Sequence, residues 1–330
     1  MPESIIEVFD LKKWFPVRLG FFSSLVSRKQ LYVKAVDGIS FDIRKKEIFG
    51  LAGESGSGKT TTGRLVIRLE KPTSGKIFFH GKDIAKASEE EIKKLRNKMQ
   101  IVFQDPYESL NPRMTVFDIL AEPLRVQKLA SGAELEEKVY KALESIQLVP
   151  PEEFIWRFPH ELSGGQRQRV ATGRALIVNP EFIVADEPVS MLDVSIRAEI
   201  LNLMFDLKET YGVSFLYITH DLALARHICD RIAVMYLGKI MEKGDVEKVI
   251  FEPLHPYTKA LIDAVPDPNP EARRIETVIK GEIPSPINPP SGCRFHTRCP
   301  QFIGNICKER EPLLVEIEKE HYVACHLYSK

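Results

Sequence analysis

Residues 53–60, GESGSGKT, have the spacing G-x-x-x-x-G-K-[ST] and directly follow the apolar run EIFGLA. Glycines at this spacing let the backbone wrap closely around an anion, so that successive N–H groups converge on phosphate oxygens. A helix expected to begin near Lys59 would add its positive end. Lys59 is expected to reach the β- and γ-phosphates of a nucleotide, and the Thr60 hydroxyl to coordinate Mg2+. The predicted phosphate-binding set is Gly53, Glu54, Ser55, Gly56, Ser57, Gly58, Lys59, Thr60 and Thr61.

Two adjacent carboxylates follow another apolar run, FIVA, as Asp186 and Glu187. Acids at the end of a buried strand are costly unless they have a task. Asp186 suits the metal shell of a nucleotide, and Glu187 suits the general base that activates water. His220 ends the apolar run SFLYIT and is expected at the same sheet edge, where it would hydrogen-bond the γ-phosphate. A lone histidine is more often structural, but its place beside these motifs favours a function.

The stretch ELSGGQRQRV (161–170) contains a second glycine-rich turn at the predicted start of a helix. Such a turn can also bind an anion. One nucleotide does not need two phosphate cradles from the same chain. The simplest interpretation is that this turn serves a nucleotide held by another subunit.

Four of the five cysteines lie near the C-terminus with the spacing C-x5-C-x7-C-x17-C; they are Cys293, Cys299, Cys307 and Cys325. The N-terminus lacks the pattern of a secretory signal, and no apolar run approaches the ~18 residues of a membrane helix. We therefore expect an intracellular, soluble chain in which thiols stay reduced and disulfides do not form. Zinc accepts four thiolates but usually through tighter C-x2–4-C pairs. The wider spacing favours an iron–sulfur cluster, with zinc and unliganded thiols as alternatives, whereas Cys229 is expected in the core.

Strand and helix patterns alternate along the chain, which predicts an α/β fold with a mostly parallel sheet. The runs IIEVF, VKAVDGISFDI and EIFGLAG read as strands, residues 89–99 as a short charged helix, and QIVF as the next strand. A helical segment at about 105–170 interrupts this alternation. Lys plus Arg and Asp plus Glu cancel at 46 each, so no global field would recruit nucleic acid.

Taken together and in chain order, these motifs resemble those of the ATP-binding cassette (ABC) ATPases over about residues 5–250. Gln104 after QIVF and SMLD (190–193) complete the set, although Met191 stands where the family usually places a small residue. The resemblance implies a P-loop NTPase with a RecA-like parallel core, an N-terminal antiparallel β part and an inserted helical subdomain. It also implies that Gln104 senses Mg2+ and couples to a transmembrane partner.

The same resemblance implies a head-to-tail dimer that holds ATP between the P-loop of one subunit and the LSGGQ turn of the other. The residues that would act in trans are Ser163, Gly164, Gly165 and Gln166, with Asp193 crossing the interface. The family also stacks an N-terminal aromatic on adenine. Phe15 is the favoured platform by position, with Trp14 and Tyr32 as alternatives.

Three further blocks, at 103–124, 251–266 and 281–300, look like the ATPase subunits of bacterial and archaeal oligopeptide/dipeptide importers. This resemblance implies two transmembrane permease subunits, a second identical or homologous ATPase, an extracytoplasmic peptide-binding protein, and a peripheral position at the cytoplasmic face of the membrane. The subfamily's cysteine tail is associated with a 4Fe-4S cluster. Related importers carry nickel or oligosaccharides, so either could be the transported solute instead of a peptide. An ABC ATPase that acts on nucleic acid is a less favoured alternative, because the chain has a single cassette and a net charge of zero.

We accordingly predict a nucleotide-binding domain at 1–250 and a C-terminal extension at 251–330, with a proline-rich connector before the cysteines. The segment 17–30, which contains FFSSLV, is interpreted as a long hairpin loop or, alternatively, as a contact with a membrane partner.

Overall fold

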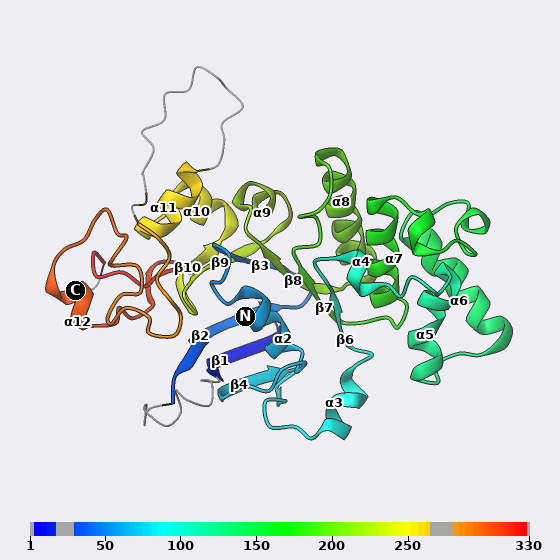
Figure 1. The fold of residues 1–330 in the computed structure, drawn as a ribbon, viewed down its shortest axis with the longest axis horizontal. Coiled ribbons are helices and arrows are strands. Elements are labelled where there is room, and N and C mark those ends of the chain that lie inside the picture. The colour runs from blue at the N-terminus through cyan, green and yellow to red at the C-terminus, as the bar shows by residue number, and fades with distance from the viewer. Residues whose placement is uncertain (1–2, 18–29, 265–278, 280, 329–330) are drawn as a thin grey trace, which may run out of the picture. The chain divides into compact units, whose positions relative to one another are not determined.

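The computed structural model describes residues 3–17, 30–264, 279 and 281–328 (Figure 1). The chain forms two compact units. Unit 1 comprises Met1–Glu3, Ile43–Ile48 and Ala87–Tyr217. Unit 2 comprises Ser4–Asp42, Phe49–Lys86 and Ile218–Lys330. Most of the predicted loop at 17–30 and most of the proline-rich connector lie outside the described residues, so both remain predictions.

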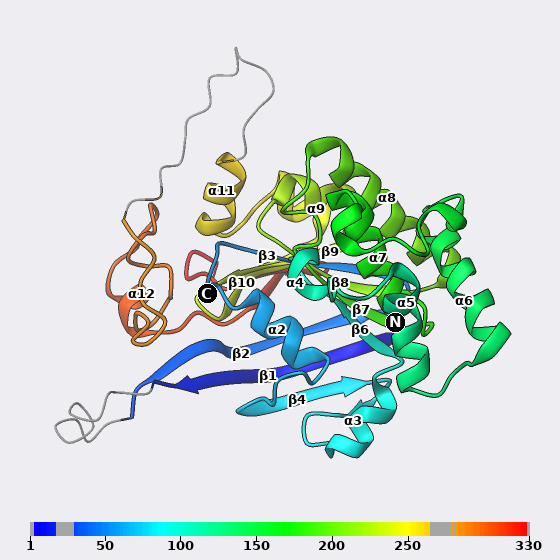
Figure 2. The same cartoon turned by 45° about the vertical axis from the view of Figure 1, so that its right-hand side comes forward.

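Unit 2 contains an antiparallel sheet with the strand order β2–β1–β4–β5. The strands are β1 (Ser4–Pro16), β2 (Tyr32–Arg44), β4 (Ser74–Phe79) and β5 (Lys82–Asp83). Strands β1 and β4 pair in register from Ile6 with Phe79 to Phe9 with Lys76, and Figure 2 shows β1, β2 and β4 side by side. Ile6 and Val8 are buried, as alternation along a half-buried strand requires. The predicted N-terminal antiparallel part is thereby confirmed.

A second set of strands in unit 2 has the order β11–β12–β10–β9–β3. Their bounds are β3 (Ile48–Ala52), β9 (Arg231–Tyr236), β10 (Lys239–Asp245), β11 (Val315–Glu318) and β12 (His321–Val323). Strands β3 and β9 are parallel, as predicted, whereas β10, β12 and β11 add antiparallel pairs. This second set of strands is therefore mixed, and the cysteine-bearing tail contributes β11 and β12 to it.

The helices of unit 2 are short. They are α2 (Lys59–Val66), α9 (Leu222–Ile228), α10 (Val246–Phe251), α11 (Pro256–Asp263) and α12 (Asn305–Glu309). Helix α2 follows β3 through the glycine-rich loop, which is the strand–loop–helix arrangement that the motif predicts.

Unit 1 contains the strand order β8–β7–β6, with β6 (Met99–Val102), β7 (Phe182–Asp186) and most of β8 (Ser214–Thr219). Strands β6 and β7 are parallel, with Met99 opposite Phe182. Its helices are α3 (Glu89–Leu95), α4 (Pro106–Ser109), α5 (Val116–Val126), α6 (Gly132–Ser145), α7 (Gly164–Leu176) and α8 (Val194–Tyr211), with 3-10 turns at Pro151–Glu153 and Pro159–Glu161.

Residues 105–170 are all described and contain helices and turns but no strand, which agrees with the predicted helical insertion. Helices α5, α6 and α7 pack against one another. The contact is close at Gly173 of α7, where a Cβ atom would lie 2.8 Å from Ile146 Cδ1 and 3.2 Å from Leu120 Cδ2. The absence of a side chain at Gly173 therefore lets α7 pack closely against these two residues.

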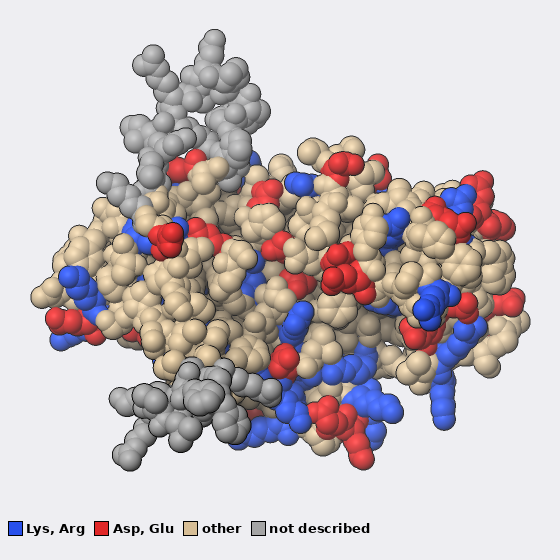
Figure 3. Space-filling model, viewed as in Figure 1, with Lys and Arg blue, Asp and Glu red and all other residues tan. Residues whose placement is uncertain are grey.

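Charges of both signs are interspersed on the molecular face drawn in Figure 3. This agrees with the formal net charge of zero and with the absence of a single-sign field on that face. None of the helices within the described ranges combines the length and the apolar character that crossing a membrane requires.

Candidate nucleotide-binding site

The glycine-rich loop of unit 2 joins β3, which ends at Ala52, to α2, which begins at Lys59. Gly53 has a φ of 148° and Gly58 a φ of 104°, both in the region that side chains disfavour. A Cβ atom at Gly53 would lie 2.2 Å from the Met235 carbonyl oxygen, and one at Gly58 would lie 2.1 Å from that of Ala35. Only glycine fits either position, so the loop geometry needs the residues that the motif specifies.

Lys59 is 5% exposed, and its ammonium is held by the loop itself. Its Nζ donates to the carbonyl oxygens of Gly53, at 2.7 Å, and Glu54, at 3.0 Å. Helix α2 has no acidic residue in its first turn, so no carboxylate there competes for its positive end. The buried lysine, the glycine cradle and the helix start together fit the phosphates of a nucleotide.

Two residues that the sequence did not predict also contact this loop. The Glu54 N–H donates to the Tyr257 hydroxyl at 2.9 Å, and the Glu54 carboxylate forms an ion pair with Arg298 at 2.7 Å. Burial raises the pKa of Tyr257 far above its usual value, so this hydroxyl stays neutral. Tyr257 and Arg298 are both far from the loop in the sequence. The one sequence feature that singled them out is that they lie in the blocks 251–266 and 281–300, which resemble the ATPase subunits of peptide importers.

The aromatic residues near the end of β1 differ in their contacts. Phe15 is half-buried, with Lys13 Nζ 4.8 Å from the centre of its ring. The Trp14 Nε1–H donates to Asp37 Oδ1 at 2.9 Å, and Lys34 Nζ lies 4.6 Å from the Trp14 ring centre. These contacts engage both the ring face and the polar group of Trp14. The choice of Phe15 as the adenine platform stays a prediction.

Unit 1 contains the predicted general base Glu187, the predicted metal-shell residue Asp186 and the predicted Mg2+ sensor Gln104. Asp186 ends β7 and is 3% exposed. Glu187 follows with a φ of 45°, a left-handed conformation that is uncommon outside glycine. Its carboxylate Oε2 accepts a hydrogen bond from Gln104 Nε2 at 3.3 Å. The structure thus brings together two of the side chains assigned to catalysis and metal sensing.

The LSGGQ turn forms the N-terminus of α7, also in unit 1. Ser163 is the N-cap: its hydroxyl accepts from the Gln166 N–H at 3.3 Å, and Gln166 Oε1 accepts from the Ser163 N–H at 2.9 Å. A Cβ at Gly165 would lie 2.5 Å from Ile196 Cγ2 of α8, so this glycine permits close helix packing. Gly164 is half-buried and Ser163 is exposed.

Asp193 is the N-cap residue of α8 and is exposed, as is Met191 two residues before it. His220 is also exposed and follows β8 in unit 2, the unit that carries the P-loop. The assembly of the residues of the two units around one nucleotide stays a prediction.

The four C-terminal cysteines form no disulfide within the described residues; Cys299 is half-buried and the other three are buried. Burial, reinforced by the other thiols of the set, raises the pKa of Cys293 to about 12 and that of Cys299 to about 11. Burial also raises the pKa of Cys325. The described residues include all of these thiols, yet no group of three or more His, Cys, Asp or Glu among them is placed to hold a metal ion. The structure therefore does not support the predicted metal site.

Cys229 is buried, as predicted for a core residue. A Cβ atom built on Gly50 of β3 would lie 2.9 Å from its Sγ, so Cys229 packs directly on the strand before the P-loop.

Comparison with known proteins places these motifs in a family. Residues 36–190 match the family described as "ABC transporter", and residues 241–307 match "Oligopeptide/dipeptide transporter, C-terminal region". The chain is 51% identical over 330 residues to the oligopeptide transport ATP-binding protein AppF of Bacillus subtilis (strain 168), covering 99% of this chain and 98% of that protein. It is 44% identical over 321 residues to the dipeptide transport ATP-binding protein DppF of Haemophilus influenzae, covering 97% and 96%.

Solved structures confirm the ABC ATPase fold. The cassette MJ0796, in a dimeric post-hydrolysis state bound to ADP and Pi, is 28% identical with a TM-score of 0.62, covering 73% of this chain and 98% of that one. CbiO1 from Clostridium perfringens, part of an ABC transporter complex, is 28% identical with a TM-score of 0.64, covering 76% and 92%. The chain belongs to the ABC transporter ATP-binding proteins, in the family that contains the oligopeptide and dipeptide transport ATP-binding proteins.

Proposed function

We propose that this chain hydrolyses ATP to power the import of dipeptides or oligopeptides through a membrane ABC transporter. The observation that carries the proposal is the P-loop geometry, in which two obligatory glycines and the buried Lys59 form a cradle for phosphates. Relatives that match nearly the whole chain are named as oligopeptide and dipeptide transport ATP-binding proteins, which supports peptides as the imported solute.

The roles of the side chains follow from their chemistry. Lys59 stabilises the charge that develops on the transferring phosphoryl group. Thr60, Gln104 and Asp186 would hold Mg2+, which when bound neutralises phosphate charge. Glu187 takes a proton from the attacking water. His220 donates a hydrogen bond to the γ-phosphate.

Phe15 would stack on adenine, with the backbone of residues 53–61 around the phosphates. In a dimer, the exposed start of α7 would complete the site of the partner subunit, because a helix N-terminus favours an anion. The residues acting in trans would be Ser163, Gly164, Gly165, Gln166 and Asp193.

The proposed partners are two permease subunits, a second ABC ATPase and, indirectly, an extracytoplasmic peptide-binding protein, with the chain peripheral at the cytoplasmic face of the membrane. A permease helix would dock at residues 107–115. Tyr107 of this block is 62% exposed, and the Cζ atom of Arg167 lies 4.0 Å from the centre of its ring. Cysteine pairs engineered between this block and the permease should crosslink. Failure at every exposed position of the block would contradict this docking site.

We also propose that the four cysteines ligate a 4Fe-4S cluster. What supports it is that all four thiols lie in one C-terminal segment, three of them buried, with a spacing wider than zinc sites usually use. Thiolates are the ligands, so loading must release protons from these thiols. Anaerobically purified protein should be brown, absorb broadly near 400 nm and contain about four irons per chain. Colourless protein with one zinc, or with neither metal, would contradict the cluster.

The hydrolytic function is tested with Lys59→Ala in the assembled transporter. Loss of the ammonium should lower ATP turnover by about 10²-fold or more. Lys86→Ala is the matched control, because Lys86 is an exposed lysine of the same unit outside the loop. Near-normal turnover by Lys59→Ala would overturn the assignment of the P-loop.

A further inference from the structure

Glu54, the second residue of the P-loop, has each of its polar groups engaged. Its carboxylate pairs with Arg298 and its N–H donates to the Tyr257 hydroxyl. Its carbonyl oxygen accepts from Lys59 Nζ at 3.0 Å. Two of these three contacts come from beyond residue 250, and the third is the phosphate-binding lysine. Glu54 therefore connects the C-terminal region to Lys59 within unit 2.

The ion pair between Arg298 and Glu54 has two-point geometry. Arg298 Nη1 lies 2.7 Å from Glu54 Oε2, and Nη2 lies 3.2 Å from Oε1. Nη1 also lies 3.3 Å from the Tyr236 hydroxyl. The side chains of Arg298 and Glu54 are 8% and 23% exposed. Paired guanidinium–carboxylate contacts that are shielded from solvent fix orientation as well as charge.

Arg298 is held in place by the cysteine-bearing turn, residues 293–299. The Cys293 N–H donates to the Cys307 carbonyl oxygen at 2.9 Å, and the Arg298 N–H donates to that of Phe295 at 3.0 Å. Phe295 is fully buried, with ring centres 5.3 Å from Tyr236 and 5.2 Å from Tyr257. The backbone of this turn thus determines where the guanidinium lies.

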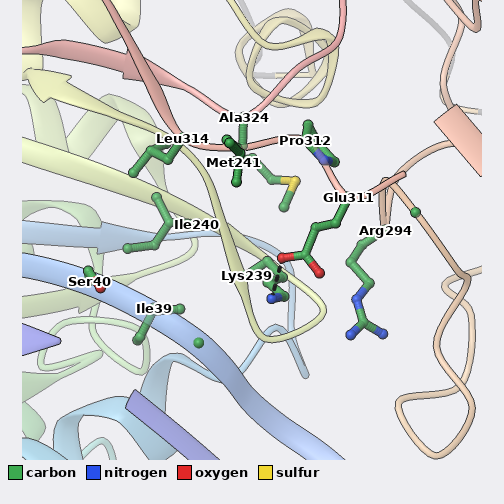
Figure 4. A pocket seen from close by; sticks show the side chains of 13 residues that line it. Ile39, Ser40, Lys239, Ile240, Met241, Arg294, Glu311, Pro312, Leu314 and Ala324 are labelled. Carbon is green, nitrogen blue, oxygen red and sulfur yellow. Dashed lines mark hydrogen bonds and ion pairs between the residues drawn. The ribbon is translucent and has the colours of Figure 1, made fainter. Parts of the chain in front are cut away.

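The same turn is anchored at a second point on unit 2. Arg294 Nη2 pairs with Asp37 Oδ2 at 2.5 Å, and both side chains are buried. Close by, Lys239 at the start of β10 forms an ion pair with Glu311 at 2.5 Å beside a cavity of about 180 Å3 (Figure 4). These contacts attach the C-terminal segment to β2 and β10 independently of the P-loop.

We propose that Arg298 is a positioning residue of the nucleotide site, through which the cysteine-bearing turn sets the P-loop for ATP. This inference rests on the proposed ATP binding by residues 53–61. Arg298 neutralises a carboxylate that would otherwise stand unpaired in the phosphate-binding loop and repel the anionic nucleotide. It also fixes the residue whose carbonyl oxygen holds the Lys59 ammonium.

The test is a double-mutant cycle on the full chain, with Mg-ATP affinity measured by isothermal titration calorimetry. Arg298→Ala should weaken binding by about ten-fold or more, since charged hydrogen bonds in shielded sites are worth that much. Adding Glu54→Gln removes the unpaired charge, so Arg298→Ala/Glu54→Gln should recover most of the affinity. If Arg298 had only a structural role, Glu54→Gln would not restore the affinity. The changes in binding free energy caused by the two substitutions would then simply add.

Arg310→Ala serves as the matched control, because Arg310 is an exposed arginine of the same C-terminal segment. It should bind Mg-ATP as the wild type does. If Arg298→Ala fails to fold, Arg298→Gln takes its place, because it removes the charge but keeps a long polar side chain; it should weaken binding, and Glu54→Gln should relieve the loss in the same way.

Wild-type affinity in the Arg298 variant, or a loss that Glu54→Gln does not relieve, would overturn the inference. A wild-type chain that binds no Mg-ATP would instead contradict the proposed function, so the two failures are distinguishable.

Discussion

Glu187 is a residue held in an unfavourable backbone conformation beside a functional partner. Its φ of 45° typically costs about 1–3 kcal/mol for a residue other than glycine. Such strain is maintained where the surrounding structure requires it, and here the carboxylate accepts a hydrogen bond from Gln104. The conformation of Glu187 therefore supports a functional role for its carboxylate at the end of β7.

Glu187→Gln should therefore slow hydrolysis without preventing ATP binding. The amide keeps the shape of the side chain but cannot accept the proton of the attacking water, so turnover should fall by about 10²-fold or more. With Mg-ATP, the variant should run as a dimer in size-exclusion chromatography, with its ATPase partner present if one is needed. Glu137→Gln, an exposed change on α6, is the control. A monomeric variant with wild-type turnover would show that Glu187 is not the base.

Local chemistry explains which residues of the site were predictable. The glycines at 53 and 58 are required by positive φ and by close backbone contacts, so the motif alone specifies them. Arg298 and Tyr257 reach the loop only because the chain folds back from beyond residue 250. No spacing rule connects such distant positions, and these contacts became evident only in three dimensions.

At the scale of elements, the N-terminus of α11 is a buried polar cluster. The buried Glu242 carboxylate on β10 accepts from the backbone N–H groups of Leu254, at 2.8 Å, and His255, at 2.9 Å. His321 Nε2 of β12 lies 2.8 Å from the same carboxylate. His255 caps the helix by accepting from the Tyr257 N–H at 3.0 Å. This cluster joins β10, α11 and the C-terminal strand.

Stability should fall in mild acid because of His255. Burial lowers its pKa from 6.5 to about 4; the nearby Glu242 opposes this shift, whereas Lys259 adds to it. Below pH 6.5, His255 is protonated in the unfolded chain but stays neutral in the folded chain. The free energy of unfolding therefore falls as the pH drops from 6.5 toward 4. The loss should reach about 2–3 kcal/mol.

The measurement is the free energy of unfolding at pH 7 and at pH 4.5 for the wild type and for His255→Asn. Asparagine can still cap the helix but does not titrate. The difference in free energy of unfolding between the wild type and His255→Asn should be smaller at pH 4.5 than at pH 7. Parallel pH profiles for the two proteins would refute the role of His255.

The start of α7 combines a stable cap with an exposed glycine turn. The reciprocal hydrogen bonds of Ser163 and Gln166 satisfy two backbone donors and fix the turn. Ser163→Ala should impair hydrolysis mainly at the site whose P-loop belongs to the partner subunit. Mixed dimers with one mutated subunit would show this, with Ser195→Ala as an exposed serine control on α8. A defect confined to the P-loop of the mutated subunit would contradict the shared site.

The elements themselves were largely predictable where the pattern was strong. Apolar runs indicated β3, β7 and β8, and apolar periodicity indicated α5 and α6. The short strands β11 and β12 were not predicted. Val315–Glu318 alternates Val and Ile with two glutamates over only four residues and is mostly exposed, so its pattern is too short to stand out, and its pairing with β12, and that of β12 with β10, identifies it as a strand.

At the scale of the whole molecule, unit 2 combines the P-loop and the described C-terminal segment in one compact body. The ABC transporter match ends at residue 190, and the C-terminal match begins at 241. The contacts of Arg298 and Tyr257 with Glu54 cross this division of the sequence. The C-terminal region therefore contributes directly to the environment of the P-loop.

ATP-powered peptide import is tested most directly by uptake of a labelled oligopeptide into proteoliposomes. The assay contains the permease subunits, this ATPase with any ATPase partner, and the binding protein supplied on the side from which the peptide enters. With Mg-ATP on the side of the ATPase, the wild type should accumulate the peptide, whereas Lys59→Ala should reduce uptake to the level without ATP. Uptake that is equal with and without ATP, or unchanged by Lys59→Ala, would contradict the proposed function.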